Sequence, residues 1–244
     1  RQVKYTPNDP LVSQQCSLNS VKATQAWDFW NIPNGNIPDG QQVLLASVDT
    51  GVDYTHPDIQ NNSWINQAEI PEWLGEAGLD QNGDGYYDAS EVVLWLQNEG
   101  MDVDGDGFYT LRDIVSTGSP FEDGVDDDGN GYADDLLGWD TSGAAGIDDN
   151  DPYPKEGVVS SGTWAHGTHV AGIAAGSGGG QTDTTTGLKY IGAAPGAFLV
   201  TILACCDGDI EDIIQGAQWA IENKKRERLR RRWGWDINLS LIHI

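Results

Sequence analysis

The chain has 244 residues, ten of them tryptophan, with a formal net charge of −25 and 39% apolar residues. This length is ample for a buried core, and so many tryptophans exclude a wholly disordered polymer. The pI near 4.1 excludes nucleic acid and anionic membranes as expected partners, because phosphate groups are bound by clustered Lys and Arg. No apolar run approaches the ~18 residues of a membrane span, and three cysteines are too few for a disulfide scaffold.

Charge and glycine content divide the chain into three zones. Residues 1–65 are mixed, residues 66–151 are rich in Asp and Gly, and residues 152–244 are rich in Gly and Ala. The middle zone holds 23 of the 38 acidic residues and one basic residue, Arg112. A basic run covers residues 224–232, and we interpret it as lineage variation or a sequence error. The alternative is a cationic helix extension that faces the acidic zone.

Apolar patterns in chain order predict alternating strands and helices. Residues 41–48 (QQVLLASV) are typical of a buried parallel strand. Residues 166–176 (HGTHVAGIAAG) carry small side chains at close spacing, which predicts a helix packed tightly on a sheet. Residues 197–203 (AFLVTIL) predict a second strand, and Asp209 is a suitable N-cap for a helix with apolar residues at helical spacing. This alternation predicts an α/β sandwich.

Residues 80–91 match the twelve-position calcium-binding loop throughout. Such a loop supplies oxygen ligands from positions 1, 3, 5, 7, 9 and 12 and has Gly at position 6 for its sharp turn. Two carboxylates 4 Å apart repel by ~4 kcal/mol at an effective dielectric of 20, so their convergence requires a hard cation. The predicted ligands are Asp80, Asn82, Asp84, Tyr86, Asp88 and Glu91.

Two further loops repeat this pattern with changes at their ends. The second has the predicted ligands Asp102, Asp104, Asp106, Phe108, Thr110 and Asp113. The third has the predicted ligands Asp126, Asp128, Asn130, Tyr132 and Asp134. Because position 12 of the third loop is Leu137, that loop needs another ligand, for which Asp135 is the candidate. The alternative for each loop is a solvated acidic segment whose Asp-Gly pairs only form turns.

We expect calcium to order a zone that is too polar to form its own core. A short helix is predicted after Glu91, over residues 92–96, so that the first two loops resemble an EF-hand pair. Such a pair would bury Leu94, Trp95 and Leu111.

Two motifs flank the acidic zone. ASVDTGVDYTHPDI places Asp49 at the carboxyl end of the predicted strand, and HGTHVAG places His166 at the start of the predicted helix. Together they closely resemble the subtilisin-like (S8) serine peptidases, as do the segments IGAAPGA and QWAI near residues 191 and 218. The resemblance covers residues 5–65 and 120–241, with the calcium loops inserted between the two motifs.

The resemblance implies a three-layer sandwich with a mostly parallel sheet, incomplete at the C-terminus, and an Asp-His-Ser triad. Asp49 would orient and stabilise the imidazole, and His166 would act as general base and then general acid. The alternative is a purely structural role for each residue: Asp49 would cap a helix or turn, and His166 would be a hydrogen-bonded histidine of the core. His169 would be structural and bonded within the core, while His56 would shape the turn after the strand.

Members of the resembled family bind extended peptides as an added strand. By resemblance, the segment containing Asp207 and Gly208 forms one edge of the cleft, and the segment containing Ser240 and Leu241 forms the other. Cys205 and Cys206 lie near this rim, and we interpret them as filling space; a free thiol or a strained bond is the alternative.

Residues 1–244 contain neither the Gly-Thr-Ser-x-Ala nucleophile segment nor the Ala-Gly-Asn oxyanion segment of the resembled family. Taken alone, they are therefore predicted to be inactive. The start at Arg1 indicates a processed or truncated piece, and the closing LSLIHI resembles a translated sequencing adapter. The predicted domains are 1–65 and 152–241 as parts of a peptidase domain, 66–151 as a calcium-binding insert, and 242–244 as an artefactual tail.

We therefore predict a secreted, calcium-stabilised serine endopeptidase acting on polypeptides, represented by its amino-terminal portion and made with a propeptide. Millimolar extracellular calcium fills even weak sites, which favours an exported location. The alternative is a non-catalytic calcium-binding or pseudo-peptidase module. The loops and the missing serine favour that alternative, and the intact surroundings of Asp49 and His166 disfavour it.

Overall fold

A parallel sheet forms the centre of the molecule. The computed structural model describes residues 14–30, 43–143, 148–155, 163–177, 191–204, 210–229 and 238–242. Within them the strands are β1 (Val43–Asp49), β2 (Gly138–Asp140), β3 (Phe198–Leu203) and β4 (Asn238–Ile242). Their order is β2-β3-β1-β4, and every neighbouring pair is parallel. The predicted strands at 41–48 and 197–203 are thus confirmed, one or two residues shifted.

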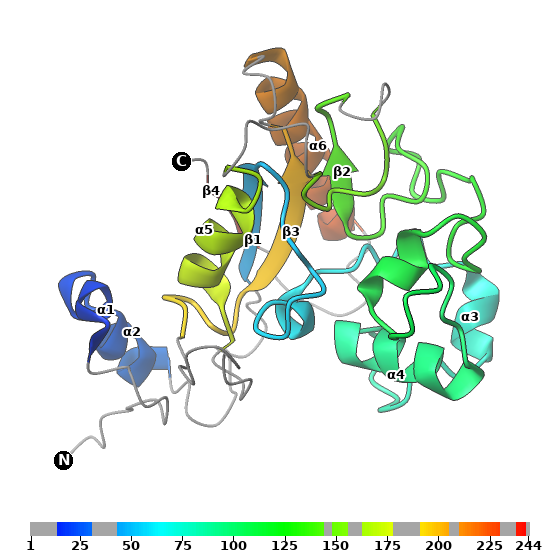
Figure 1. The fold of residues 1–244 in the computed structure, drawn as a ribbon, viewed down its shortest axis with the longest axis horizontal. Coiled ribbons are helices and arrows are strands. Elements are labelled where there is room, and N and C mark those ends of the chain that lie inside the picture. The colour runs from blue at the N-terminus through cyan, green and yellow to red at the C-terminus, as the bar shows by residue number, and fades with distance from the viewer. Residues whose placement is uncertain are drawn as a thin grey trace.

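Helices cover both faces of this sheet (Figure 1). Those flanking it are α5 (His166–Ala175) and α6 (Ile210–Leu229). Because successive strand residues point to opposite faces, Leu44, Ala46 and Val48 share a core with Trp219 of α6. Leu45 instead shares a core with Ala171 and Ala175 of α5. The predicted three-layer α/β sandwich is confirmed.

The remaining helices lie outside the sandwich core. They are α1 (Cys16–Ser20), α2 (Ala23–Trp30), α3 (Glu72–Glu76), α4 (Ala89–Glu99) and the short 3-10 helices η3 (Gln60–Asn62) and η4 (Leu111–Val115). The predicted N-cap Asp209 lies outside the described residues. Of the helices that are described, none combines the length and the apolar character needed to cross a membrane.

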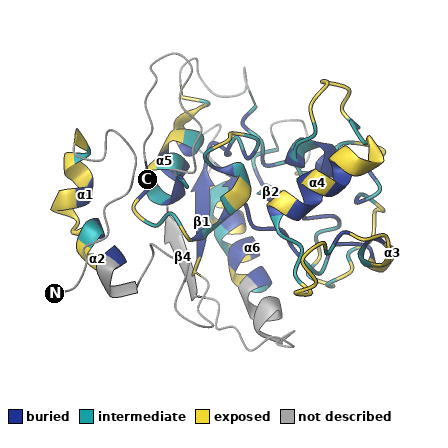
Figure 2. Ribbon diagram, turned by 90° about the horizontal axis from the view of Figure 1, so that it is seen from below, coloured by how far each residue is buried: buried dark blue, intermediate teal, exposed yellow. Residues whose placement is uncertain are grey.

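The acidic zone has an apolar core of its own, contrary to our expectation. Its principal members are Val92 and Leu96 of α4, Leu111 and Ile114 of η4, and Phe121. These apolar residues occur between the polar loops, so their contribution to one core is not visible as a long apolar run. The buried side of α4 is seen in Figure 2.

Helix α4 confirms the helix predicted over residues 92–96, but it is longer and begins at Ala89, before Glu91. Asp88 and Glu91 make a reciprocal capping box at its start, and Gly100 ends it in the left-handed conformation. Trp95 and Leu111 are buried as predicted, but Leu94 is 44% exposed. Leu94 was wrongly assigned to the core because it points away from the face that carries its buried neighbours.

Candidate active site

Strand β1 and helix α5 bring one carboxylate and one imidazole together. Asp49, the last residue of β1, is 3% exposed, and its Oδ1 accepts the backbone N–H of Thr50 at 2.7 Å. His166, the first residue of α5, places Nδ1 at 2.7 Å from Oδ1 and 3.0 Å from Oδ2 of Asp49. The imidazole side chain is 42% exposed, so a buried acid supports a base that reaches the surface.

The close approach of α5 depends on Gly167. A Cβ atom there would lie 2.2 Å from the carbonyl oxygen of Gly51 and 3.1 Å from Cβ of Asp49. The N–H of Gly167 donates to Oγ1 of Thr50 at 3.0 Å, and the N–H of Asp53 donates to Oγ1 of Thr168 at 2.8 Å. The start of the helix is thereby docked on the loop that follows β1.

This geometry sets the chemistry that the pair can perform. Since an ionised carboxylate only accepts hydrogen bonds, Nδ1 of His166 is the donor and Nε2 is the nitrogen left to take up a proton. The buried carboxylate also stabilises the imidazolium that such a transfer would create. The arrangement is suited to general base and general acid chemistry at Nε2.

The other two histidines of these motifs have different surroundings. His56 shapes the turn as predicted, since its Nδ1 accepts the N–H of Asp58 at 3.2 Å. His169 is exposed, so the prediction that it bonds within the core is wrong. It lies on the solvent side of α5, whereas Val170 and Ala171 carry the buried face.

The residues predicted to line the substrate cleft are placed only in part. Asp207, Gly208, Cys205 and Cys206 lie outside the described residues. Ser240 and Leu241 belong to β4, where their backbone pairs with β1. The assignment of cleft edges stays a prediction.

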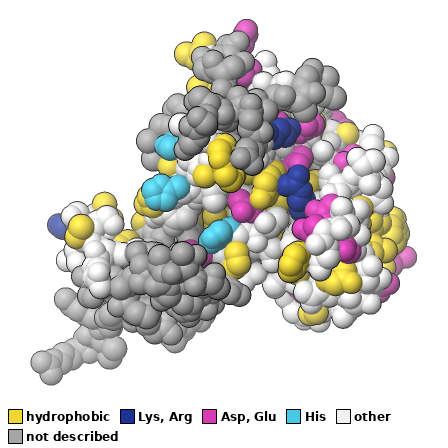
Figure 3. Space-filling model, viewed as in Figure 1, with side chains coloured by type: hydrophobic (Ala, Val, Ile, Leu, Met, Phe, Trp, Pro, Cys, Tyr) yellow, Lys and Arg dark blue, Asp and Glu magenta, His cyan; other side chains and the backbone are white. Residues whose placement is uncertain are grey.

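The three acidic loops share one backbone pattern. The N–H of position 6 donates to the carboxylate of position 1 in each: from Gly85 to Asp80 at 2.9 Å, from Gly107 to Asp102 at 3.0 Å, and from Gly131 to Asp126 at 2.7 Å. The three glycines have φ of +80°, +87° and +98°, a conformation that favours glycine. Figure 3 shows acidic side chains gathered on the side of the molecule that carries this zone.

In the second loop, three carboxylates are close enough to share an ion. One oxygen each of Asp102, Asp104 and Asp106 lies within 4.8 Å of the others. Oδ1 of Asp102 is buried and has no hydrogen-bond partner in the described part of the chain, an arrangement that a cation would satisfy.

In the first loop, no three acidic side chains of the described residues come so close. Position 3 there is Asn82, whose amide oxygen accepts the N–H of Asp84 at 2.8 Å. Asp88 accepts the N–H groups of Ser90 and Glu91 as the cap of α4.

In the third loop, an acid that is distant in the sequence takes the place of the position-12 acid. In the first two loops the position-12 acid accepts the N–H groups of positions 3 and 9: Glu91 from Asn82 and Asp88, and Asp113 from Asp104 and Thr110. In the third, Glu69 accepts them instead, from Asp128 at 2.9 Å and Asp134 at 3.0 Å. Glu69 therefore stands where Leu137 leaves the pattern without an acid.

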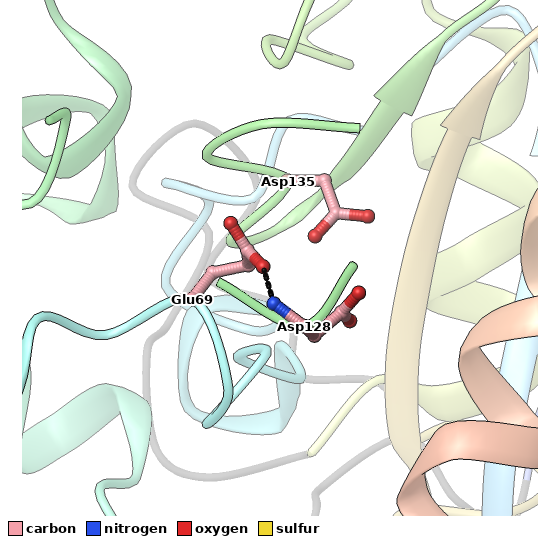
Figure 4. Close-up of side chains that lie close together, drawn as sticks. All are labelled: Glu69, Asp128 and Asp135. Carbon is pink, nitrogen blue, oxygen red and sulfur yellow. Dashed lines mark hydrogen bonds between the residues drawn. The ribbon is translucent and has the colours of Figure 1, made fainter. Parts of the chain in front are cut away.

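Sequence reasoning missed Glu69, because it is 59 residues from Asp128 along the chain and no loop spacing points to it. Figure 4 shows Glu69, Asp128 and Asp135 converging, with one oxygen of each within 4.8 Å of the others. By contrast, the carboxylate of Asp134 accepts the N–H groups of Asp123 and Gly124, outside the loop. The structure thus gathers Asp128 with Glu69 and Asp135.

Two of these acids are deeply buried. Glu69 and Asp135 are 1% and 0% exposed, and burial raises the pKa of Glu69 to about 8 and that of Asp135 to about 7. Asp135 accepts N–H groups from Asn66 and from Trp219 of α6, each at 2.7 Å. The third loop is therefore joined to the sandwich through a buried hydrogen bond.

Comparison with known proteins identifies a matching family and several similar proteins. The model of the subtilase family matches residues 40–227. Thermitase of Thermoactinomyces vulgaris is 34% identical over 86 residues, which are 34% of this chain and 25% of thermitase. Halolysin of Haloferax mediterranei is 33% identical over 84 residues, 34% of this chain and 14% of halolysin. The match to the Protease 2 small chain of Achromobacter lyticus is 45% identical over 60 residues, 23% of this chain and 82% of that one.

Proposed function

The chain belongs to the subtilase family, and on that premise we propose that Asp49 and His166 are the acid and the base of a serine endopeptidase. The observation that carries the proposal is the 2.7 Å contact between Nδ1 of His166 and Oδ1 of Asp49. A structural ion pair would not require an imidazole that is partly open to solvent at the carboxyl end of a core strand. The chain spans a quarter or less of thermitase and halolysin, and the activity proposed is that of the longer polypeptide.

The proposed reaction follows from Nε2 of His166, the ring nitrogen that does not contact Asp49. His166 takes the proton of a serine hydroxyl as that oxygen attacks the peptide carbonyl carbon, and Asp49 stabilises the imidazolium. The imidazolium then gives its proton to the leaving amine, and water hydrolyses the acyl-enzyme in the same way. Because residues 1–244 hold no Gly-Thr-Ser-x-Ala segment, the serine would come from outside them. Secretion, a propeptide and the cleft edges near Asp207 and Ser240 belong to the same proposal.

We propose calcium as the structural ligand of the three loops. All of the gathered donors are oxygen atoms, which is what Ca²⁺ prefers. Oδ1 of Asp102, which has no hydrogen-bond partner among the described residues, fits such an ion. Glu69 and Asp135 would complete the third site with Asp128. The ion would hold the carboxylates together and keep the loops against the insert's apolar core.

A fluorophosphonate label tests the peptidase proposal. The longer reading frame is expressed with the native His166, with His166→Ala and with His56→Asn; residues 1–244 are a further sample. We expect the native form and the His56→Asn control to be labelled, and the His166→Ala and 1–244 forms not. A complete reading frame that is neither labelled nor able to cleave peptides would favour the alternative, a calcium-binding pseudo-peptidase, which the missing serine segment supports.

Calcium titration of the 1–244 chain tests the metal proposal separately. We expect binding by calorimetry and a higher melting temperature in 1 mM calcium than in a chelator. No heat of binding and no change in melting temperature at millimolar calcium would contradict the proposal.

A further inference from the structure

Residues 149–155, here called the bridging segment, include the end of the acidic zone and contact the loop that follows Asp49. One end is fixed to the sheet, because Asp149 and Asp140 of β2 form an antiparallel bridge. Nζ of Lys155 lies 2.5 Å from Oδ2 of Asp140 and 2.9 Å from Oδ2 of Asp149. Both ends of the segment are therefore anchored to Asp140 of β2.

The middle of the bridging segment rests directly on residues 50–55. The carbonyl oxygen of Pro152 accepts the N–H of Val52 at 3.3 Å, and a Cβ atom at Gly51 would lie 2.6 Å from that oxygen. The hydroxyl of Tyr54 donates to Oδ1 of Asp151 at 2.6 Å. Displacement of the segment would therefore remove one of the two supports of the loop that follows Asp49, the other being the start of α5.

Arg112 joins this segment to the insert. Its guanidinium carbon lies 4.3 Å from the centre of the Tyr153 ring, and Nη2 is 3.8 Å from Oδ2 of Asp151. Nε is 3.8 Å from Oδ2 of Asp104 in the second loop. The Tyr153 ring in turn packs edge-on against Tyr54, with centroids 5.4 Å apart.

We infer that Arg112 is a positioning residue for the proposed active site: it holds the bridging segment on residues 50–55 and so keeps Asp49 against His166. This inference deepens the proposed function and rests on it. A planar guanidinium can cover a ring and face two carboxylates at once, which the point charge of a lysine cannot do. Partly exposed ion pairs at 3.8 Å are individually weak, so the expected consequence is looser geometry at Asp49 rather than loss of the fold.

The direct readout is the rate at which the Nδ1 proton of His166 exchanges with solvent. It is measured from the downfield ¹H NMR resonance of this proton in the 1–244 chain, well below the melting temperature. We expect Arg112→Gln to speed the solvent exchange of this proton about tenfold, and Arg112→Lys to restore less than half of the loss. Asp151→Asn removes the charge opposite Arg112 but keeps an acceptor for Tyr54, and it should speed the exchange in the same direction. The matched control is Lys22→Asn, which removes one positive charge at a residue with φ of +60°, a conformation that asparagine tolerates.

Equal exchange rates in Arg112→Gln, Asp151→Asn and the Lys22→Asn control would overturn the inference. A change in melting temperature alone, without faster exchange, would also overturn it, because that is what a purely structural role predicts. The proposed function fails differently: the longer polypeptide would show no peptide hydrolysis although the His166 proton remains protected. If the peptidase is active, Arg112→Gln should lower kcat about tenfold and leave KM within twofold, since misplacement acts on the chemical step.

Discussion

The sandwich and the acidic zone of residues 66–151, called the insert, are held in place by different kinds of contact. In the sandwich, apolar side chains on both faces of β1 hold the sheet between α5 and α6, and the candidate site needs one buried acid. In the insert, an apolar core forms around α4. In each acidic loop of the insert, the first carboxylate accepts a hydrogen bond from the backbone N–H of the loop glycine. The difference teaches that the two regions share apolar cores but differ in what covers them, since only the insert carries acidic loops over its core. An ion would act on the loops.

The largest expected effect concerns the sandwich alone. Asp49→Asn should lower kcat of the longer polypeptide by about 10⁴-fold, because the amide no longer fixes the tautomer of His166 or stabilises its positive charge. Calcium binding by the insert should not change. Steady-state peptide hydrolysis and calorimetry check both statements, with the exposed Glu72→Gln as a charge-matched control. A loss of less than tenfold would remove Asp49 from the proposed mechanism.

The second effect concerns the insert alone. Leu96 is fully buried in the insert core, so Leu96→Ala should lower the free energy of unfolding by about 2–5 kcal/mol. Leu94→Ala on the same helix should change it by less than about 0.5 kcal/mol, because Leu94 is exposed. Urea denaturation of the two variants measures the difference. Equal losses would mean that α4 does not pack as described.

A smaller effect tests whether the third loop uses Glu69. Glu69→Gln should weaken one class of calcium sites about tenfold or more, since an anionic ligand is replaced by a neutral one. Glu76→Gln, an exposed acid before the first loop, is the control. Calorimetry of the 1–244 chain resolves the sites. Unchanged binding in Glu69→Gln would assign position 12 of the third loop to another group.

The last effect is a pH dependence of the metal-free protein. The pKa of Glu69 is raised from 4.5 to about 8, and a carboxyl group whose pKa is higher in the folded chain stabilises the fold while it is protonated. That contribution is complete below about pH 4 and is lost as the pH rises towards 8. The melting temperature in a chelator should therefore fall over this range. The melting temperature should fall less steeply with pH in Glu69→Gln, and also in the native chain with calcium bound. If Glu69→Gln showed the same slope as the metal-free native chain, Glu69 would not be the source of the pH dependence.

Local patterns predicted the parts of the structure that local rules govern. The strand ending at Asp49 and the helix from His166 depend on the spacing of apolar and small side chains, and the helix around Glu91 depends also on a cap within a few residues; all three are confirmed. The loop glycines were likewise visible, since each sharp turn requires a residue that accepts positive φ.

Features that join distant segments were not predictable from one sequence. Glu69 completes a loop that begins far along the chain, and Asp135 accepts a hydrogen bond from Trp219 of α6, 84 residues away in the sequence. The insert core was missed because its apolar residues occur between acidic loops. The exposure of His169 and Leu94 depends on which face of each helix is covered, which spacing over a few residues does not decide.

The short strand β2 has a consequence for how separable the two regions are. It begins directly after Leu137, inside the acidic zone, and pairs with β3, so this zone itself supplies one strand of the sheet. A protein engineer who excised the acidic segment, or transplanted it to another scaffold, would have to divide a hydrogen-bonded strand from its loop. The acidic loops and the sheet are thus joined by a shared strand, and exchanging the loops for those of another protein would need a new junction upstream of Gly138.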